Sequence, residues 1–233
     1  MRKILLLVLL TVLISCKQGN ETPAAKTDEV QAIYDRAREM QSAEQARHKN
    51  DPALKDYFEY FRQANYSAAF KSVEIAALEG NSQAQVEIAS LYLKGQGVPV
   101  NINNAIFWLD KSHEQGNVMA SPALGEIYFS ASLGHQDFEK ANTHYRLCAM
   151  RLMVSCVVPY AMLHVTNGSG HYDPVNASAW LEIGVDLNAP GAVKNRDTLL
   201  PQLSEEQVEE IQAAKLELLS SIAKELKHET GAK

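Results

Sequence analysis

The sequence predicts an all-α fold, in which pairs of helices stack into an α/α solenoid. Small residues recur every 36 residues, at Ala84, Ala120, Cys156 and Ala192, and again at Ala69, Ala105, Ala141 and Ala177. A fixed period in this range is typical of repeat proteins whose unit is one supersecondary element. Apolar residues within the unit follow the i, i+3, i+4 spacing of helices, and glycine-containing turns separate the helices. Each unit is therefore expected to be one helix pair.

The chain begins with a targeting segment, residues 1–15. Arg2 and Lys3 precede an apolar run from Ile4 to Ile14 that only Thr11 interrupts. This run is far shorter than the roughly 20 residues that span a bilayer. A basic start followed by a short apolar stretch is typical of a signal peptide.

The end of that segment, Leu13-Ile14-Ser15-Cys16, resembles a bacterial lipobox. The resemblance implies cleavage before Cys16, lipidation of its thiol and acylation of the new amine, which together give stable membrane anchoring. Lys17 after the cysteine implies sorting to the outer membrane, facing the periplasm. Cleavage would also change the formal charge from −6 to −8, so the lipid rather than the protein surface would hold the membrane. The alternative is an ordinary signal peptide followed by a chance cysteine.

The residues that follow divide into a tether and N-terminal helices. Residues 16–27 are polar, contain Gly19 and Pro23, and are expected to be flexible. Residues 28–64 are expected to form helices, the first lying on the solenoid or free of it. Asp51-Pro52 opens the next one, because proline is tolerated in a first helical turn.

Residues 65–192 hold the repeats, and residues 193–233 are expected to cap them. The first helix of each full unit shares small or apolar positions: Ala84, Ile88, Leu91, Tyr92; Ala120, Leu124, Ile127, Tyr128; Cys156, Tyr160, Leu163, His164. The second helix repeats Ala105, Trp108, Leu109; Ala141, His144, Tyr145; Ala177, Trp180, Leu181. In the C-terminal cap, Ser204 and Gln207 have the spacing of a capping box, and the charged helix after them suits the end of a solenoid.

The first full unit resembles the Sel-1-like repeat, a relative of the tetratricopeptide repeat. The positions that match the family pattern in order are Ala84, Leu91, Tyr92, Gly95, Gly97, Val98, Ala105, Trp108, Lys111, Gly116 and Ala120. The later units are degenerate. The resemblance covers residues 65–192 and implies a solenoid that binds other proteins.

The remaining cysteines, Cys148 and Cys156, are expected to form a disulfide. Each lies four residues from the turn expected near Leu152, so the two should face each other across a helical hairpin. Equivalent pairs in the other units are small: Ala76 and Ala84, Ser112 and Ala120, Gly184 and Ala192. An exported protein meets oxidising conditions. The alternative is two buried free thiols.

Two similar loops raise the question of a metal site. Gly134-His135-Gln136-Asp137 and Gly170-His171-Tyr172-Asp173 are one period apart. Histidine and aspartate ligate metals, but both aspartates also stand where a helix N-cap is expected, which leaves the histidines in solvent. We expect the capping role, no metal and no cofactor. The sequence contains no recognisable catalytic triad, phosphate loop or zinc-protease motif.

The expected function is a protein–protein interaction module on the outer membrane. By analogy with related repeats, the first helix of each pair lines the concave side. The residues of this helix that are not needed for packing between units are the candidate partner-binding residues: Glu87, Ser90, Lys94, Glu126, Phe129 and Ser130. The acidic balance argues against a nucleic-acid partner. Two alternatives stay open, an immunity protein that neutralises a periplasmic toxin or lipase and, in a different class, a cell-wall or β-lactam hydrolase.

Overall fold

The computed structural model describes residues 23–229 and consists there of helices joined by turns and loops. The α-helices are α2 (Pro23–Lys49), α3 (Lys55–Arg62), α4 (Tyr66–Leu78), α5 (Ser82–Lys94), α6 (Ile102–Glu114), α7 (Ser121–Phe129), α8 (Phe138–Ala149), α9 (Val154–Leu163), α10 (Pro174–Asp186), α11 (Ala192–Leu199) and α12 (Glu205–Glu229). Short 3₁₀ turns η1 (Pro52–Leu54), η2 (Val118–Ala120), η3 (Ala131–Leu133) and η4 (Leu200–Gln202) join or extend them. The all-α prediction is confirmed.

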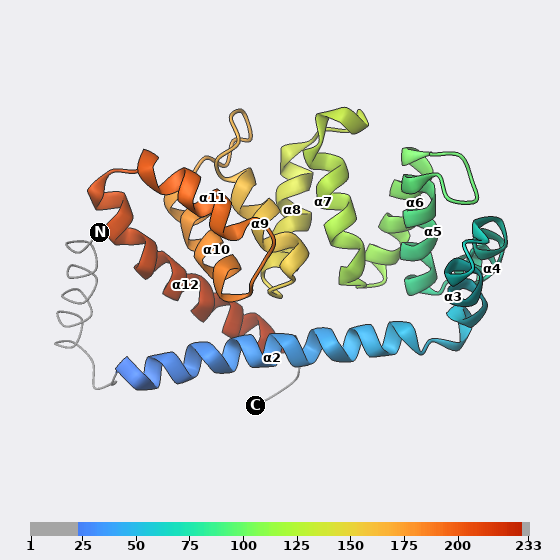
Figure 1. The fold of residues 1–233 in the computed structure, drawn as a ribbon, viewed down its shortest axis with the longest axis horizontal. Coiled ribbons are helices and arrows are strands. Elements are labelled where there is room, and N and C mark those ends of the chain that lie inside the picture. Colours follow the sequence, from blue (N-terminus) through green and yellow to red (C-terminus); the bar gives the residue numbers. More distant parts are fainter. Residues whose placement is uncertain (1–22, 230–233) are drawn as a thin grey trace.

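The helices from α3 to α11 pack as consecutive antiparallel pairs that form an arch (Figure 1). The long helix α2 runs beneath this arch, from the α3–α4 end towards α12, and α12 descends to meet it (Figure 1). The structure is therefore a solenoid whose open side is crossed by its own N-terminal helix.

The turn between one unit and the next repeats the same backbone conformation. Gly80, Gly116, Leu152 and Asn188 are 36 residues apart and all have positive φ, at 95°, 80°, 55° and 55°. Glycine adopts this left-handed conformation freely, whereas leucine and asparagine occupy it at some cost. The period therefore persists in the backbone where the sequence has lost the glycine.

The second helix of each full unit starts at a side-chain cap at the equivalent position. Asn101, Asp137 and Asp173 accept hydrogen bonds from the backbone N–H groups of Asn104, Lys140 and Asn176, at 3.0, 3.0 and 2.9 Å. These bonds satisfy N–H groups that a helix start leaves without a partner. The capping role expected for both aspartates is confirmed.

The core is a single layer of buried side chains between the two rows of helices. Trp108 and Trp180 are buried at equivalent positions, and His144 occupies the same position in the unit between them. Glycine permits close approach at two places. A Cβ on Gly97 would lie 2.1 Å from the carbonyl oxygen of Tyr66, and one on Gly125 would lie 2.5 Å from the Tyr145 ring.

The two ends of the described chain refine the expected boundaries. Helix α2 starts at Pro23, so residues 23–27 are helical rather than part of the expected tether. Proline suits this position because the first N–H groups of a helix have no partner within it. At the other end, Ser204 and Gln207 exchange hydrogen bonds of 3.0 and 3.2 Å, which confirms the capping box.

Candidate functional site

Helix α2 is fixed to the far half of the solenoid by polar contacts. The Tyr34 hydroxyl donates to the carboxylate of Asp186, at the end of α10, over 2.7 Å. The side-chain amide of Gln41 donates to the carbonyl oxygens of Arg151 and Leu152, at 3.0 and 3.1 Å. Both contact points lie at the end of the second helix of a unit. Helix α2 therefore runs along the edge of the solenoid where one unit turns into the next.

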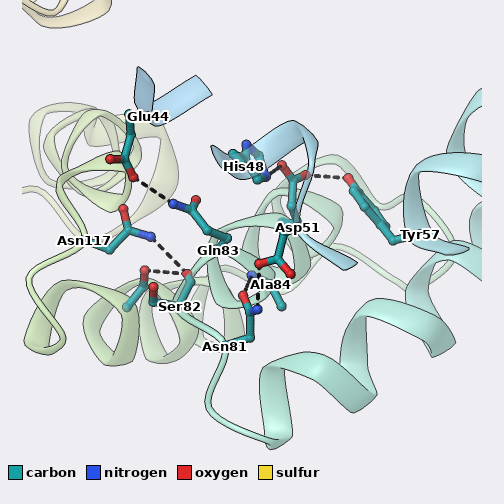
Figure 2. Close-up of polar contacts among 11 residues, drawn as sticks. Glu44, His48, Asp51, Tyr57, Asn81, Ser82, Gln83, Ala84 and Asn117 are labelled. Atoms are coloured by element: carbon teal, nitrogen blue, oxygen red, sulfur yellow. Dashed lines mark hydrogen bonds and ion pairs between the residues drawn. The ribbon is translucent and has the colours of Figure 1, made fainter. Parts of the chain in front are cut away.

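The C-terminal end of α2 meets α5 in a half-buried polar junction (Figure 2). Gln83 donates to the carboxylate of Glu44 over 2.9 Å, and the His48 ring lies 3.0 Å from the carboxylate of Glu87. The Tyr57 hydroxyl also donates to Glu87. The hydrogen bond with Glu87 raises the pKa of His48, and burial followed by the charge of Glu87 raises the pKa of Tyr57. The junction thus pairs a histidine and a tyrosine with one carboxylate.

A second set of hydrogen bonds in Figure 2 connects the start of η1, the turn that follows α2, to the start of α5. The carboxylate of Asp51 accepts from Ala53 N–H at 2.9 Å and from the Asn81 side chain at 2.8 Å. Asn81 in turn caps α5 by accepting from Ala84 N–H at 2.9 Å. The backbone carbonyl of Ser82, next to Asn81, continues these hydrogen bonds into the following unit.

That carbonyl accepts two hydrogen bonds from the unit that follows. The Ser112 hydroxyl donates to it over 2.7 Å, and the side-chain amide of Asn117 donates over 3.1 Å (Figure 2). Asn117 lies one period after Asn81 and also caps its own turn, by accepting from Met119 N–H at 3.0 Å. Adjacent units are therefore joined by polar contacts at the turn edge.

Between α2 and these turns lies a groove of about 800 Å³. One wall consists of α2 side chains from Met40 to Arg47, and Leu226 of α12 contributes at one end. The other wall is made by equivalent positions of three successive units. These positions are Ser82, Val118 and Val154, and next to them Gln83, Met119 and Ser155. The groove is the candidate functional site.

Side-chain amides and apolar residues line the groove together, and its charges are balanced. Glu44 and Asp51 contribute two negative charges, and Arg47 and Arg151 two positive ones. Arg47 lies 3.4 Å from the Glu44 carboxylate. Both carboxylates also accept the hydrogen bonds described above. This arrangement suits a ligand without net charge rather than an anion or a cation.

The candidate partner-binding residues lie on α5, on α7 and just after α7, on the row of first helices, and not in the groove. Glu87 is engaged by His48 and Tyr57, so α2 and α3 occupy the surface that this residue was expected to present. Ser90 is half-buried and Lys94 is exposed. Sequence reasoning missed this occupation of Glu87 because it left the position of the N-terminal helix open.

The candidates of the next unit are partly used within their own helix pair. Glu126 is exposed and accepts from the Tyr145 hydroxyl over 2.9 Å. Phe129 is half-buried, with its ring 6.0 Å from that of Phe138 and 6.1 Å from that of Tyr145. The hydroxyl of Ser130 lies 2.8 Å from that of Ser132. Phe129 thus acts first as a packing residue, and only its outer edge can serve a partner.

Cys148 and Cys156 form a disulfide, with Cα atoms 5.9 Å apart. Both side chains are fully buried, at the contact between α8 and α9. The equivalent helix contact in the last full unit is also close, since a Cβ on Gly184 would lie 3.0 Å from that of Ala192. The small residues at these positions therefore mark one recurring close approach of helices.

The histidines of the two similar loops do not converge on a metal site. His171 lies 3.4 Å from the carboxylate of Glu139, and its carbonyl oxygen lies 2.9 Å from Nδ1 of His164. Within residues 23–229, no three histidine, cysteine, aspartate or glutamate side chains are placed to hold one ion. Burial lowers the pKa of His164, and it lowers that of His144 to about 4. Both are packing histidines that stay neutral at physiological pH.

Sequence reasoning did not find the groove, although the repeat contains a signal for it. Asn81 and Asn117 recur at the period as helix caps, Met119 lies just after the turn at Gly116, and Met153 lies just after the turn at Leu152. These positions could be recognised as one edge of the solenoid, but not as one wall of a groove. Cys16, expected to carry lipid, lies outside the described residues. None of the helices in residues 23–229 is both long and apolar enough to cross a bilayer.

Comparison with known proteins gives structural neighbours and no sequence relatives. No protein-family model and no curated protein matches the chain. A Sel1 repeat protein from Oxalobacter formigenes aligns with a TM-score of 0.49 and 23% identity, over 54% of this chain and 52% of that one. A protective antigen of uropathogenic Escherichia coli with an SLR fold, c5321, aligns with a TM-score of 0.39 and 24% identity, over 71% and 44%. The chain thus spans about half the length of each.

The assignment of the fold rests on the structure itself. Its helix pairs follow each other at the 36-residue spacing, with the caps and left-handed turns at equivalent positions. The chain has a Sel-1-like repeat fold. This Sel-1-like solenoid differs from a simple stack in that α2 closes its turn edge and creates the groove.

Proposed function

We propose that the protein is a binding module of the bacterial envelope, anchored by lipid on Cys16 and facing the periplasm from the outer membrane, that captures another protein and catalyses no reaction. The groove between α2 and the turns of the solenoid carries this proposal. Equivalent positions of three units line one side of it, so it can follow a partner chain over a distance of two unit spacings. Repeat proteins generally use such extended surfaces for binding.

The way the groove is built also supports a binding role. Its size lies within the range of roughly 300–1,000 Å³ that is usual for ligand sites. Its side chains are held in place by the polar contacts of Gln41, Gln83 and Asn117. A surface that is ordered before binding loses less conformational entropy when the partner arrives. The disulfide between α8 and α9 stiffens the wall next to it.

Site-specific photo-crosslinking in the producing cell tests the proposal. A benzoylphenylalanine replaces Met119 in the groove, Phe129 at the end of α7, or Tyr172, which is 65% exposed on the loop before α10 and does not line the groove. We expect one envelope protein to crosslink from position 119 and not from position 172. Crosslinks from position 129 alone would move the binding surface to the row of first helices. No crosslink from positions 119 and 129 would refute the proposal.

The anchor is tested separately. Replacing Cys16 by alanine should abolish labelling by a fatty-acid analogue and release the protein from the membrane fraction, because the remaining chain is acidic and has no affinity of its own for an anionic surface. Membrane association of the Cys16→Ala variant after signal-peptide cleavage would contradict lipid anchoring. The crosslinking result stands or falls independently of this one.

A further inference from the structure

The groove contains hydrogen-bonding groups that the fold itself does not use, and they define the chemistry of its ligand. The first turn of every α-helix leaves backbone N–H groups without a partner in the helix. At α5 the N-cap Asn81 satisfies one of them, whereas the N-cap of α9 is Met153, which has no side-chain oxygen. The N–H groups of Val154 and Ser155 therefore begin α9 at the groove without a side-chain cap.

A buried acceptor lies on the same wall of the groove, two units before these donors. Gln83 lines the groove, is only 9% exposed and uses its Nε2 atom to hold Glu44. Its Oε1 atom is buried and has no hydrogen-bond partner. A buried carbonyl oxygen without a donor is costly and is normally satisfied in native proteins. Oε1 of Gln83 is a separate observation from the N–H groups at the start of α9, and it indicates a ligand with an N–H or O–H group.

Methionine supplies half of the apolar residues that line the groove. Met40 contributes from α2, Met119 from η2 and Met153 from the N-cap of α9, and the others are Val118, Val154 and Leu226. Methionine side chains are flexible and polarisable, so they adapt to apolar side chains of different shapes. The apolar contacts therefore tolerate varied ligand side chains, while the polar groups stay in fixed positions.

We infer that the groove binds a short, extended and uncharged segment of a polypeptide through its main chain. Successive peptide units of an extended main chain offer the two groups that the groove lacks. One unit brings a carbonyl oxygen for the N–H groups at the start of α9, and another, further along the segment, brings an N–H group for Oε1 of Gln83. The side chains of the segment would contact the methionines. The balanced charges of Glu44, Asp51, Arg47 and Arg151 provide no excess charge for an ionic ligand. This inference rests on the proposed function and specifies the part of the partner that is recognised.

The geometry of α9 allows one donor to be removed without disturbing the helix. Val154 is the first helical residue, and proline at this position is compatible with a helix. Met153 before it has φ −66° and ψ 116°, a conformation that a residue preceding proline adopts readily. The substitution Val154→Pro therefore deletes the N–H group and retains the backbone. Glu205→Pro makes the same change at the exposed start of α12 and is the matched control.

The experiment is a selection of peptides from a random heptamer library displayed on phage, with the full chain immobilised. We expect enriched peptides to be poor in charged residues. Synthetic copies should bind Val154→Pro about tenfold more weakly, the loss of one ordinary hydrogen bond, and bind Glu205→Pro as they bind wild type. Ser155→Trp, which fills the groove, should abolish binding. Circular dichroism and melting curves check that each variant is folded.

Three results would overturn the inference. These are no enrichment over an empty support, binding that both Val154→Pro and Ser155→Trp leave intact, and peptides that bind equally well when their main-chain nitrogens are methylated one at a time. The last result would mean that the groove reads apolar groups alone, as it would in an acyl chain. A protein that crosslinks from position 119 while no peptide binds would leave the proposed function in place and refute only this inference.

Discussion

Replacing Cys148 and Cys156 together by alanine tests how much the disulfide contributes to the stability of the solenoid. Alanine is the appropriate substitute because Ala76 and Ala84 occupy the same pair of positions in the leading unit and are buried there. The packing of the repeat therefore accepts two alanines at this helix contact. The change that remains is the loss of the covalent link between α8 and α9.

The expected magnitude follows from the eight-residue separation of the two cysteines. In the chain-entropy model, closing a loop of this length lowers the entropy of the unfolded state by an amount equal to about 2.5 kcal/mol at 25 °C. For a domain of this size each kcal/mol corresponds to a change of roughly 2–4 °C in melting temperature. The double variant should therefore melt roughly 5–10 °C below wild type.

Calorimetry of the chain from Lys17 onward, with and without a phosphine reductant, measures this difference. Wild type should lose stability on reduction, and the double variant should not respond to the reductant. Intact-mass analysis after alkylation without reductant should find no free thiol in wild type. Two alkylated thiols in that sample, or a double variant as stable as oxidised wild type, would refute the reasoning.

Three further predictions concern titration and close packing. Burial lowers the pKa of His144 to about 4 in the folded protein, so the unfolded chain takes up a proton first as pH falls below about 6.5. The free energy of unfolding should therefore drop by up to roughly 3 kcal/mol by pH 4. Urea unfolding midpoints across this pH range should show the loss, and His144→Phe should make it smaller. The pKa of His48 is raised by Glu87, so its contribution is complete below about pH 6.5 and is lost as pH rises through the folded-state pKa. His48→Gln should therefore lower the melting temperature at pH 6 and have little effect at pH 9, and equal effects at both would contradict this. Gly97→Ala places a Cβ against the Tyr66 backbone at a position with positive φ, so it should lower the free energy of unfolding in urea by at least about 2 kcal/mol. An unchanged free energy of unfolding would exclude this close approach.

The repeat could be predicted from the sequence because its determinants are local. The contacts that define one unit lie within a helix pair or between neighbours, so each unit repeats the same small, apolar and capping positions. Asp137 and Asp173 illustrate this, since each caps the helix that directly follows it. The cysteine pair was predictable for the same reason, because the two residues flank one turn.

The groove could not be predicted because its walls come from segments far apart in the chain. Tyr34 reaches Asp186, 152 residues later, and Gln41 reaches Arg151, 110 residues later. These contacts are polar and depend on the curvature of the arch, which accumulates over several units. No spacing within α2 specifies which turn it will cross.

The sequence by itself determined the helix pairs, their period, the turns between them and the close contact bridged by the disulfide. Only the tertiary structure decided where α2 lies, that Glu87 is occupied by His48 and Tyr57, and that Gln83 and the start of α9 face one groove. The physical reason is the range of the interactions. Helix propensity, capping and neighbour packing act over a few residues to one repeat, whereas the groove depends on how several repeats add up in space.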